Sequence, residues 1–120
     1  MGLTYVTVKI TSMSNSSKSY ESNFLVDTGA TDSSIPSSAL KEIGVQPEGK
    51  MTYELADGTT REYQFGGAKI EFMGDVTFGR VIFGPDNSEP LLGMTALESV
   101  GIQVDPVNRT LKRLPAIPLK

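Results

Sequence analysis

The stretch that decides the fold is Phe24-Leu25-Val26-Asp27-Thr28-Gly29-Ala30. Three apolar residues end at a carboxylate, and a threonine and a glycine follow it directly. An apolar run of this kind predicts a buried strand, and Asp-Thr-Gly predicts the turn that ends it. The sequence therefore predicts that a strand carries the carboxylate of Asp27 into the interior. Alone, the tripeptide is weak evidence of catalysis, because Asp followed by Gly is ordinary turn chemistry.

The composition limits the chemistry that the chain can perform. Its 120 residues include no Cys and no His, which excludes disulfides, thiolate metal sites and histidine catalysis. Catalysis would have to use carboxylates, hydroxyls or amines. The net charge of −3 gives no basic face for nucleic acid, and the apolar runs are much shorter than the ~20 residues that span a bilayer. We therefore expect one cytoplasmic domain over residues 1–120 that binds neither nucleic acid nor a membrane.

Alternation of apolar and polar residues predicts strands along most of the chain. Val6, Val8 and Ile10 alternate with polar neighbours, which indicates a first strand that begins near Leu3. A polar loop is expected over residues 11–22. Further strands are predicted at residues 23–26, 51–55, 60–65, 68–73, 76–83, 102–105 and 109–114. This number of short strands favours a small, closed, mostly β barrel.

A hairpin is predicted around Asp57-Gly58. Met51, Tyr53 and Leu55 alternate with smaller or polar residues before it, and a second strand follows. Asp-Gly is a favoured sequence for a two-residue primed turn. We therefore expect Asp57 and Gly58 to form the tip of a projecting hairpin.

Two short helices interrupt the strands. The first is predicted from about Ser37 to Ile43, ending at Gly44. The second carries Thr95 and Glu98 in the spacing of a capping box and ends at Gly101, where a left-handed C-cap is wanted.

The two helical segments are similar to each other. Residues 38–46 and 95–103 match in character position by position, at an offset of 57 (95 − 38). The same offset carries Ile35 onto Leu92, so each helix follows an apolar strand end. We therefore expect two similar half-domains about an approximate internal two-fold axis.

Three motifs together resemble the retropepsin-like aspartic proteases. In order and spacing, Leu25 to Ala30, the hairpin Leu55 to Thr59, and Leu91-Leu92-Gly93 are similar to the catalytic loop, the flap and the apolar-apolar-Gly motif of that family. The resemblance covers residues 3–114. It implies these roles: catalysis for Asp27; support of the active-site loop for Thr28, Gly29 and Ala30; substrate binding by the flap for Ala56, Asp57, Gly58 and Thr59; and packing beneath the catalytic loop for Leu91, Leu92 and Gly93.

The implied activity is that of an aspartic endopeptidase acting on extended polypeptide segments. The chemistry needs two carboxylates about 3 Å apart that share one proton, as aspartic proteases have. This chain has one Asp-Thr-Gly, and the motif comparison assigns Leu91-Leu92-Gly93 to the equivalent place in the second half, where there is no carboxylate. A second copy must therefore supply its own Asp27 across a symmetric contact.

The expected homodimer departs from the viral pattern. Viral relatives usually carry an acidic residue two positions after the motif glycine and an arginine after the second glycine, whereas this chain has Thr31 and Met94. Pro115 and Pro118 in the C-terminal segment remove ladder donors. We expect the dimer to be weak or assisted by substrate.

Two alternatives stay open at this stage. The fold could serve as an inactive peptide-binding or dimerisation module, or the chain could be an unrelated small β barrel in which Asp27 caps a turn. The remaining acidic residues do not follow the spacing of a calcium-binding loop, and we interpret them as solvated turn residues; they are Asp32, Asp75, Asp86, Glu89 and Asp105. No metal and no cofactor is expected.

Overall fold

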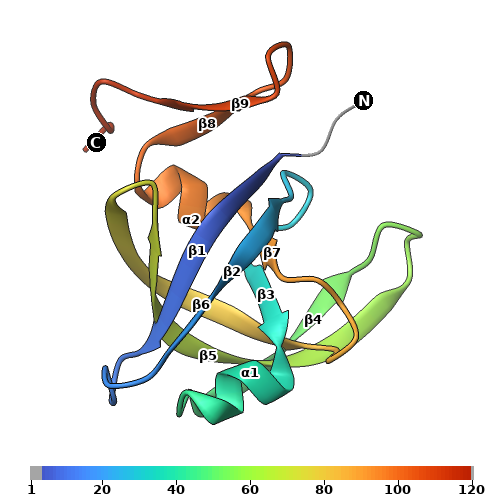
Figure 1. The fold of residues 1–120 in the computed structure, drawn as a ribbon. Coiled ribbons are helices and arrows are strands. Elements are labelled where there is room, and N and C mark those ends of the chain that lie inside the picture. Colours follow the sequence, from blue (N-terminus) through green and yellow to red (C-terminus); the bar gives the residue numbers. More distant parts are fainter. Residues whose placement is uncertain (1–3, 120) are drawn as a thin grey trace.

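The computed structural model describes residues 4–119, and most of them lie in β-strands (Figure 1). The strands are β1 Tyr5–Ser12, β2 Ser19–Val26, β3 Ser33–Pro36, β4 Gly49–Glu54, β5 Thr60–Phe72, β6 Asp75–Gly84, β7 Leu91–Leu92, β8 Ile102–Asp105 and β9 Thr110–Arg113, and the helices are α1 Ser37–Glu42 and α2 Met94–Ser99. Seven strands form one sheet in the order β1-β2-β7-β3-β6-β5-β4. A further pairing between β1 and β5 closes all of these except β4 into a ring. The predicted mostly β fold is confirmed.

Several predicted strand limits are wrong. The loop after β1 covers only residues 13–18, because pairing continues as far as Thr11 with Ser19. The strands predicted at 60–65 and 68–73 are one continuous strand, β5. Gly66 lies inside this strand and does not break it. Its lack of a side chain lets the backbone at Gln46 approach closely, because a Cβ at Gly66 would lie 2.5 Å from the carbonyl oxygen of Gln46. The predicted start of the first strand at Leu3 lies outside the described residues.

The hairpin between β4 and β5 forms, but its turn differs from the prediction. Either primed two-residue turn at Asp57-Gly58 would need positive φ at Asp57, and of the two residues only Gly58, at 86°, has positive φ. The Gly58 N–H donates to the Leu55 carbonyl oxygen at 2.9 Å, so Ala56 and Asp57 are the central residues of the turn. Positive φ at two successive residues occurs at Met73 and Gly74, which join β5 to β6.

Both predicted helices form, but the predicted capping box does not. Helix α2 begins at Met94 with Gly93 as its N-cap, and no side chain caps it. Thr95 therefore lies in the first turn of α2 and not at its cap. From this position its N–H group donates to a carbonyl oxygen of the loop that follows β2. Gly44 and Gly101 follow the two helices with φ of 89° and 72°, as the left-handed ends require.

The strand pairing follows the internal two-fold relation. Strands β2 and β7 run parallel, with Val26 opposite Leu92, and β3 and β6 run parallel, with Ile35 opposite Phe83. The 57-residue offset of the sequence relates the two pairs: Val26 plus 57 is Phe83, and Leu92 minus 57 is Ile35. Helices α1 and α2 begin and end at the same offset. The predicted internal repeat is confirmed by this register.

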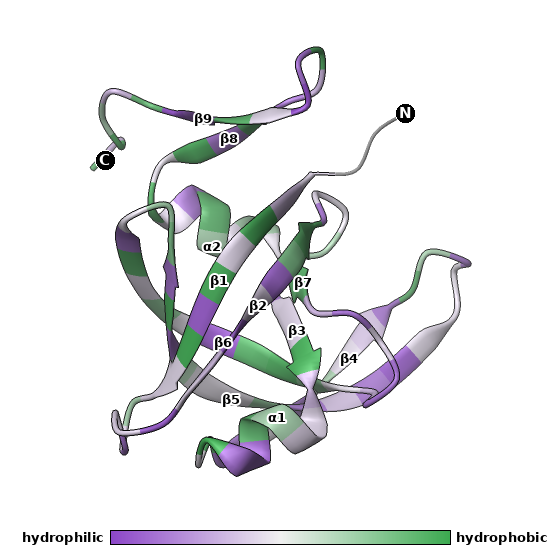
Figure 2. Cartoon of the chain, in the orientation of Figure 1, coloured by the Kyte–Doolittle hydropathy of each residue, from purple (hydrophilic) through white to green (hydrophobic). Residues whose placement is uncertain are grey.

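The core lies inside the ring and draws on both halves. Leu40 of α1 and Leu97 of α2 are fully buried, as are Val8 and Ile10 of β1. Hydrophobic and hydrophilic residues alternate along β1 (Figure 2), as expected of a strand with one face against the core. Within residues 4–119, no helix is long and apolar enough to cross a membrane.

Candidate active site

Asp27 lies directly after β2, in a loop closed by its own hydrogen bonds. Its N–H donates to the Leu92 carbonyl oxygen at 3.0 Å, which continues the β2–β7 pairing by one residue. The Gly29 N–H donates to the Asp27 carboxylate at 2.9 Å, and the Ala30 N–H donates to the Asp27 carbonyl oxygen at 3.1 Å. The backbone thus fixes both the carboxylate and the turn that follows it.

The sequence predicted that the Asp27 carboxylate lies in the interior, and the structure contradicts this prediction. Asp27 is half-buried, and Thr28 and Gly29 are exposed. The chain turns outward as soon as β2 leaves the ring, so the loop lies at the surface of a single copy. A carboxylate in this position is open to a group approaching from outside.

Helix α2 supports the same loop through its N-terminus. The Met94 N–H donates to the Ala30 carbonyl oxygen at 2.8 Å, and the Thr95 N–H donates to the Thr31 carbonyl oxygen at 3.0 Å. The first N–H groups of a helix have no partner within the helix, so the loop carbonyls satisfy them. Backbone hydrogen bonds therefore join the loop to the helix, and Thr31 and Met94, the two positions expected to depart from the viral pattern, both take part in them.

The apolar-apolar-Gly segment lies beneath this junction. Leu92 is fully buried, and the Gly93 N–H donates to the Ser33 hydroxyl oxygen at 3.0 Å. A Cβ at Gly93 would lie 2.6 Å from the carbonyl carbon of Asp32, so a side chain would displace the loop. These contacts are those expected of a support, although the functional role of the segment stays a prediction.

The counterpart of Asp27 in the second half is Gly84, and its assignment to Leu91-Leu92-Gly93 was wrong. The pairing register relates Val26 to Phe83, so the residues that follow them, Asp27 and Gly84, correspond. The motif comparison misassigned the site because β6, and not β7, is related to β2. The consequence is unchanged, since glycine provides no carboxylate either.

The hairpin predicted as a flap extends to one side of the molecule (Figure 1). All four residues of its tip, Ala56 to Thr59, are exposed. Asp57 closes the tip by accepting hydrogen bonds from the Thr59 hydroxyl at 2.6 Å and from the Thr59 N–H at 3.0 Å. These bonds, the hydroxyl first, hold the pKa of Asp57 below its ordinary value. Substrate binding by the tip stays a prediction.

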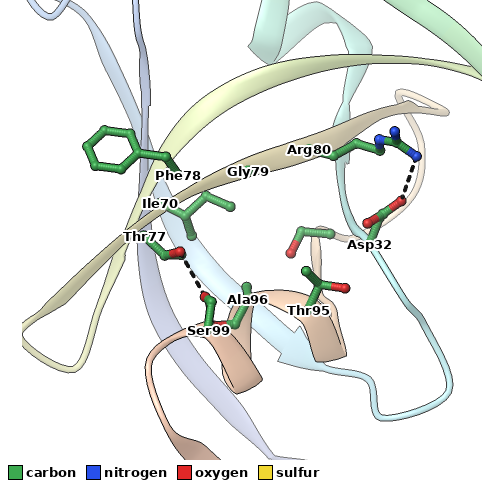
Figure 3. A pocket seen from close by; sticks show the side chains of 10 residues that line it. Asp32, Ile70, Thr77, Phe78, Gly79, Arg80, Thr95, Ala96 and Ser99 are labelled. Atoms are coloured by element: carbon green, nitrogen blue, oxygen red, sulfur yellow. Dashed lines mark hydrogen bonds and ion pairs between the residues drawn. The ribbon is translucent and has the colours of Figure 1, made fainter. Parts of the chain in front are cut away.

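Asp32 was interpreted as a solvated turn residue, and the structure contradicts this. Its side chain is only 10% exposed; it accepts a hydrogen bond from the Tyr53 hydroxyl at 2.7 Å and faces Arg80 at 3.9 Å (Figure 3). Burial, together with this hydrogen bond, raises the pKa of Tyr53 to about 12. No local signal could have revealed the contact, because the three residues lie on separate elements far apart in the chain.

Comparison with known proteins identifies the family of the chain. The model of the family described as "gag-polyprotein putative aspartyl protease" matches residues 16–99. The chain belongs to this retropepsin-like aspartyl protease family. A search of curated proteins returns no match.

Solved retropepsin-like structures share the fold. The chain is similar to the EIAV protease in complex with an inhibitor, at 19% identity over 87% of this chain and 93% of that one, with a TM-score of 0.64. It is similar to the simian foamy virus (mac) protease at 16% identity, over 78% and 90% of the two chains, with a TM-score of 0.56. A retropepsin-like aspartic protease from Rickettsia conorii matches at 22% identity, over 87% and 77%, with a TM-score of 0.55. At these identities the likeness concerns the fold alone.

Proposed function

We propose that this protein is an aspartic endopeptidase that hydrolyses peptide bonds in extended polypeptide segments, with the Asp27 residues of two copies as the catalytic pair. The observation that carries the proposal is the Asp27 carboxylate itself. It is half-buried in a loop held by the Leu92 carbonyl and by the N-terminus of α2. A carboxylate fixed in this way keeps its orientation while its outer side stays open to substrate and to a partner.

The reaction follows from the pairing of like charges. Two carboxylates about 3 Å apart cannot both be ionised, so they share one proton. The ionised member takes a proton from a water as this water attacks the peptide carbonyl carbon, and the protonated member transfers its proton to the carbonyl oxygen. The tetrahedral intermediate then collapses: its C–N bond breaks, the amine nitrogen takes up the proton that the first member accepted, and a hydroxyl proton returns to the second member as the carboxylic acid product forms. The reaction needs neither a metal nor a cofactor, and its optimum is expected at acidic pH, where one proton is retained.

The second carboxylate requires a second copy of the chain. Gly84 provides none in the second half, whereas Thr28 and Gly29 lie exposed beside Asp27. A hollow of about 420 Å³ adjoins Thr28 and is lined by mostly apolar side chains, among them Met94, Val104 and Ile117. A symmetric contact on this face brings each Asp27 toward its copy, and a hollow left open in the single chain is consistent with a partner there.

The flap completes the proposed site. An extended peptide has free backbone N–H and C=O groups, which residues Ala56 to Thr59 can pair in the manner of an added strand. Because the tip is exposed and hangs on a two-stranded hairpin, it can lift to admit a peptide and then close over it.

A cleavage assay tests the proposal. The protein should cleave unfolded polypeptide in a pepstatin-sensitive reaction, and Asp27→Asn should reduce the rate at least about a hundredfold. Asp86→Asn is the matched control, because it neutralises an exposed acid while keeping the oxygen that accepts the Ser38 N–H. Cleavage by Asp27→Asn at the wild-type rate would overturn the mechanism.

The proposed dimer has its own test. Specific activity should rise with protein concentration, and equilibrium sedimentation should show dimers at high concentration or with a bound peptide inhibitor. A chain that stays monomeric under all these conditions, with activity independent of concentration, is incompatible with the paired site.

A further inference from the structure

The flap hairpin has few connections to the rest of the molecule. Strand β4 is at the end of the sheet order, and within residues 4–119 it pairs only with β5. Among the residues that the structure describes, the bond from the Tyr53 hydroxyl to Asp32 is the single side-chain hydrogen bond between residues 49–60 and the molecule outside the hairpin. A two-stranded hairpin has little stability of its own, so this one bond has a large share in fixing the position of the flap.

The other end of this bond lies in the catalytic loop. Asp32 follows Asp27 by five positions, and the carbonyl groups of Ala30 and Thr31 between them accept hydrogen bonds from α2. The Asp32 carboxylate therefore projects from a backbone that is already fixed. It is also mostly buried, which makes a hydrogen bond to it stronger than one to an exposed acid.

Arg80 of β6 contacts both the loop that carries Asp32 and the base of the flap hairpin. Its Nη1 lies 3.9 Å from Asp32 Oδ2, the same oxygen that accepts the Tyr53 hydroxyl at 2.7 Å. Its guanidinium carbon lies 4.1 Å from the centre of the Phe65 ring, and Phe65 pairs with Gly49 at the base of the hairpin. Figure 3 shows Arg80 directed toward Asp32 across the space between their elements. One arginine thus touches both the loop and the flap.

We propose that Asp32, Tyr53 and Arg80 form a flap tether, in which Asp32 is a positioning residue that couples the flap to the loop carrying Asp27. The inference rests on the proposed function for its effect on catalysis, but the tether itself is a property of the free protein. Opening the flap for a peptide breaks the Tyr53 bond, and closing restores it. One carboxylate, that of Asp32, therefore fixes the position of the flap relative to the loop that carries Asp27.

The tether should affect substrate affinity more than the chemical step. The three residues do not touch the reacting atoms, so their loss should leave the chemical step little changed. Removing the Tyr53–Asp32 bond should instead lower the fraction of molecules whose flap is in the closed position that binds substrate. Apparent affinity falls in proportion to the competent population. Tyr53→Phe should therefore raise KM about fivefold and change kcat less than about twofold.

Hydrogen exchange of the free protein tests the tether without any need for activity. In Tyr53→Phe, amides of residues 50–60 should exchange about fivefold faster than in the wild type, while those of β1 and β2 keep the wild-type rate. Tyr63→Phe is the matched control: Tyr63 is on the same hairpin, its ring lies 6.2 Å from that of Tyr53, and its hydroxyl has no hydrogen bond among the described residues. Asp32→Asn keeps an acceptor but loses the charge facing Arg80, so a smaller increase is expected.

The outcomes separate the two proposals. Faster flap exchange in Tyr53→Phe, together with a wild-type enzyme that cleaves nothing, would support the tether and overturn the proposed function. Unchanged flap exchange in an active enzyme would overturn the tether alone. If exchange in β1 and β2 rises as much as in the flap, in both Tyr53→Phe and Asp32→Asn, the residues serve general stability and the tether is wrong.

Discussion

The segments that follow β2 and β6 occupy related places in the two halves of the molecule. Asp27 provides a carboxylate in the first half, and the corresponding residue of the second half, Gly84, provides none. The first, residues 27–32, gives its carbonyl oxygens to the N–H groups of α2. The second, residues 85–90, binds the N-terminus of α1 together with the last residue of β6: the Ser38 N–H donates to Asp86 and the Ser37 hydroxyl donates to the Gly84 carbonyl oxygen, both at 2.8 Å. Each loop thus supports the helix of the other half. The scaffold is duplicated, and the carboxylate of the proposed site is not.

The difference extends to the acid at the end of each loop. Asp32 and Glu89 are related by the same 57-residue offset, and each accepts a hydrogen bond from a tyrosine hydroxyl. The Asp32 bond to Tyr53 is 2.7 Å long and half-buried, whereas the Glu89 bond to Tyr5 is 3.3 Å long and exposed. The two acids are related by the offset but their tyrosine partners are not, and the acid of the first half has the shorter and more buried contact.

The largest effect is expected from moving the carboxylate between the loops. The double variant Asp27→Asn with Gly84→Asp should stay inactive, at least about a hundredfold below the wild type, because a Cβ at Gly84 would overlap the Ser34 hydroxyl. Cleavage assays over a range of protein concentrations provide the measurement. Cleavage by this variant at a rate near that of the wild type would show that the two loops are interchangeable, contrary to the comparison.

A side chain beneath the loop that carries Asp27 should lower the stability of the protein. Gly93→Ala places a Cβ 2.6 Å from Asp32 backbone atoms and should destabilise the protein by about 1–3 kcal/mol. Gly79→Ala in β6 is the control, since a Cβ there meets nothing within 4 Å. Urea unfolding would measure both variants. Equal stability of the two would mean that the loop is not held closely at Gly93.

The buried tyrosine contact should be visible in the alkaline range. Because the pKa of Tyr53 is raised from 10.0 to about 12, its stabilisation is complete below pH 10 and is lost as the pH rises toward 12. Tyr53→Phe should lack this part of the alkaline loss, and Tyr5→Phe should change the curve less, since the Tyr5 contact is exposed. Unfolding measured at pH 9 to 12 compares them. Identical curves for Tyr53→Phe and the wild type would contradict the contact.

The smallest effect is expected at the second loop. The backbone hydrogen bond from Ser38 holds the pKa of Asp86 below its ordinary value of 3.8, so its contribution to stability is present above that pH and is lost as the pH falls through the lowered value. Asp86→Ala should therefore be slightly less stable than the wild type at pH 7 and equal to it in strong acid. Urea unfolding at both pH values provides the check; a difference that grows in acid would have the wrong sign.

Local patterns in the sequence predicted the elements that depend on local chemistry. Gly44 and Gly101 marked the helix ends, because a helix end depends on residues close in the chain. The 57-residue offset predicted the two halves, because the two local segments are similar enough to be matched by comparison. The position of Asp27 after a strand and before a turn was predictable for the same reason.

The features that sequence reasoning missed depend on partners far along the chain. Thr95 did not become a helix cap, because carbonyl groups of the loop near Thr31 already satisfy the first turn of α2. Gly84 is the counterpart of Asp27 by the 57-residue offset, but the motif comparison assigned that place to Leu91-Leu92-Gly93, and the strand register corrected the assignment. Asp32 gained its burial and its two partners from Tyr53 and Arg80, which the fold brings from elsewhere.

The Asp57–Thr59 turn gives the flap tolerance to acid. A shared-proton protease works where ordinary carboxylates begin to take up protons, and turns that rely on an ionised aspartate weaken there. The lowered pKa of Asp57 keeps its acceptor oxygens charged at more acidic pH than an unassisted aspartate would allow. The cover of the proposed site can thus keep its shape under the conditions that its chemistry demands.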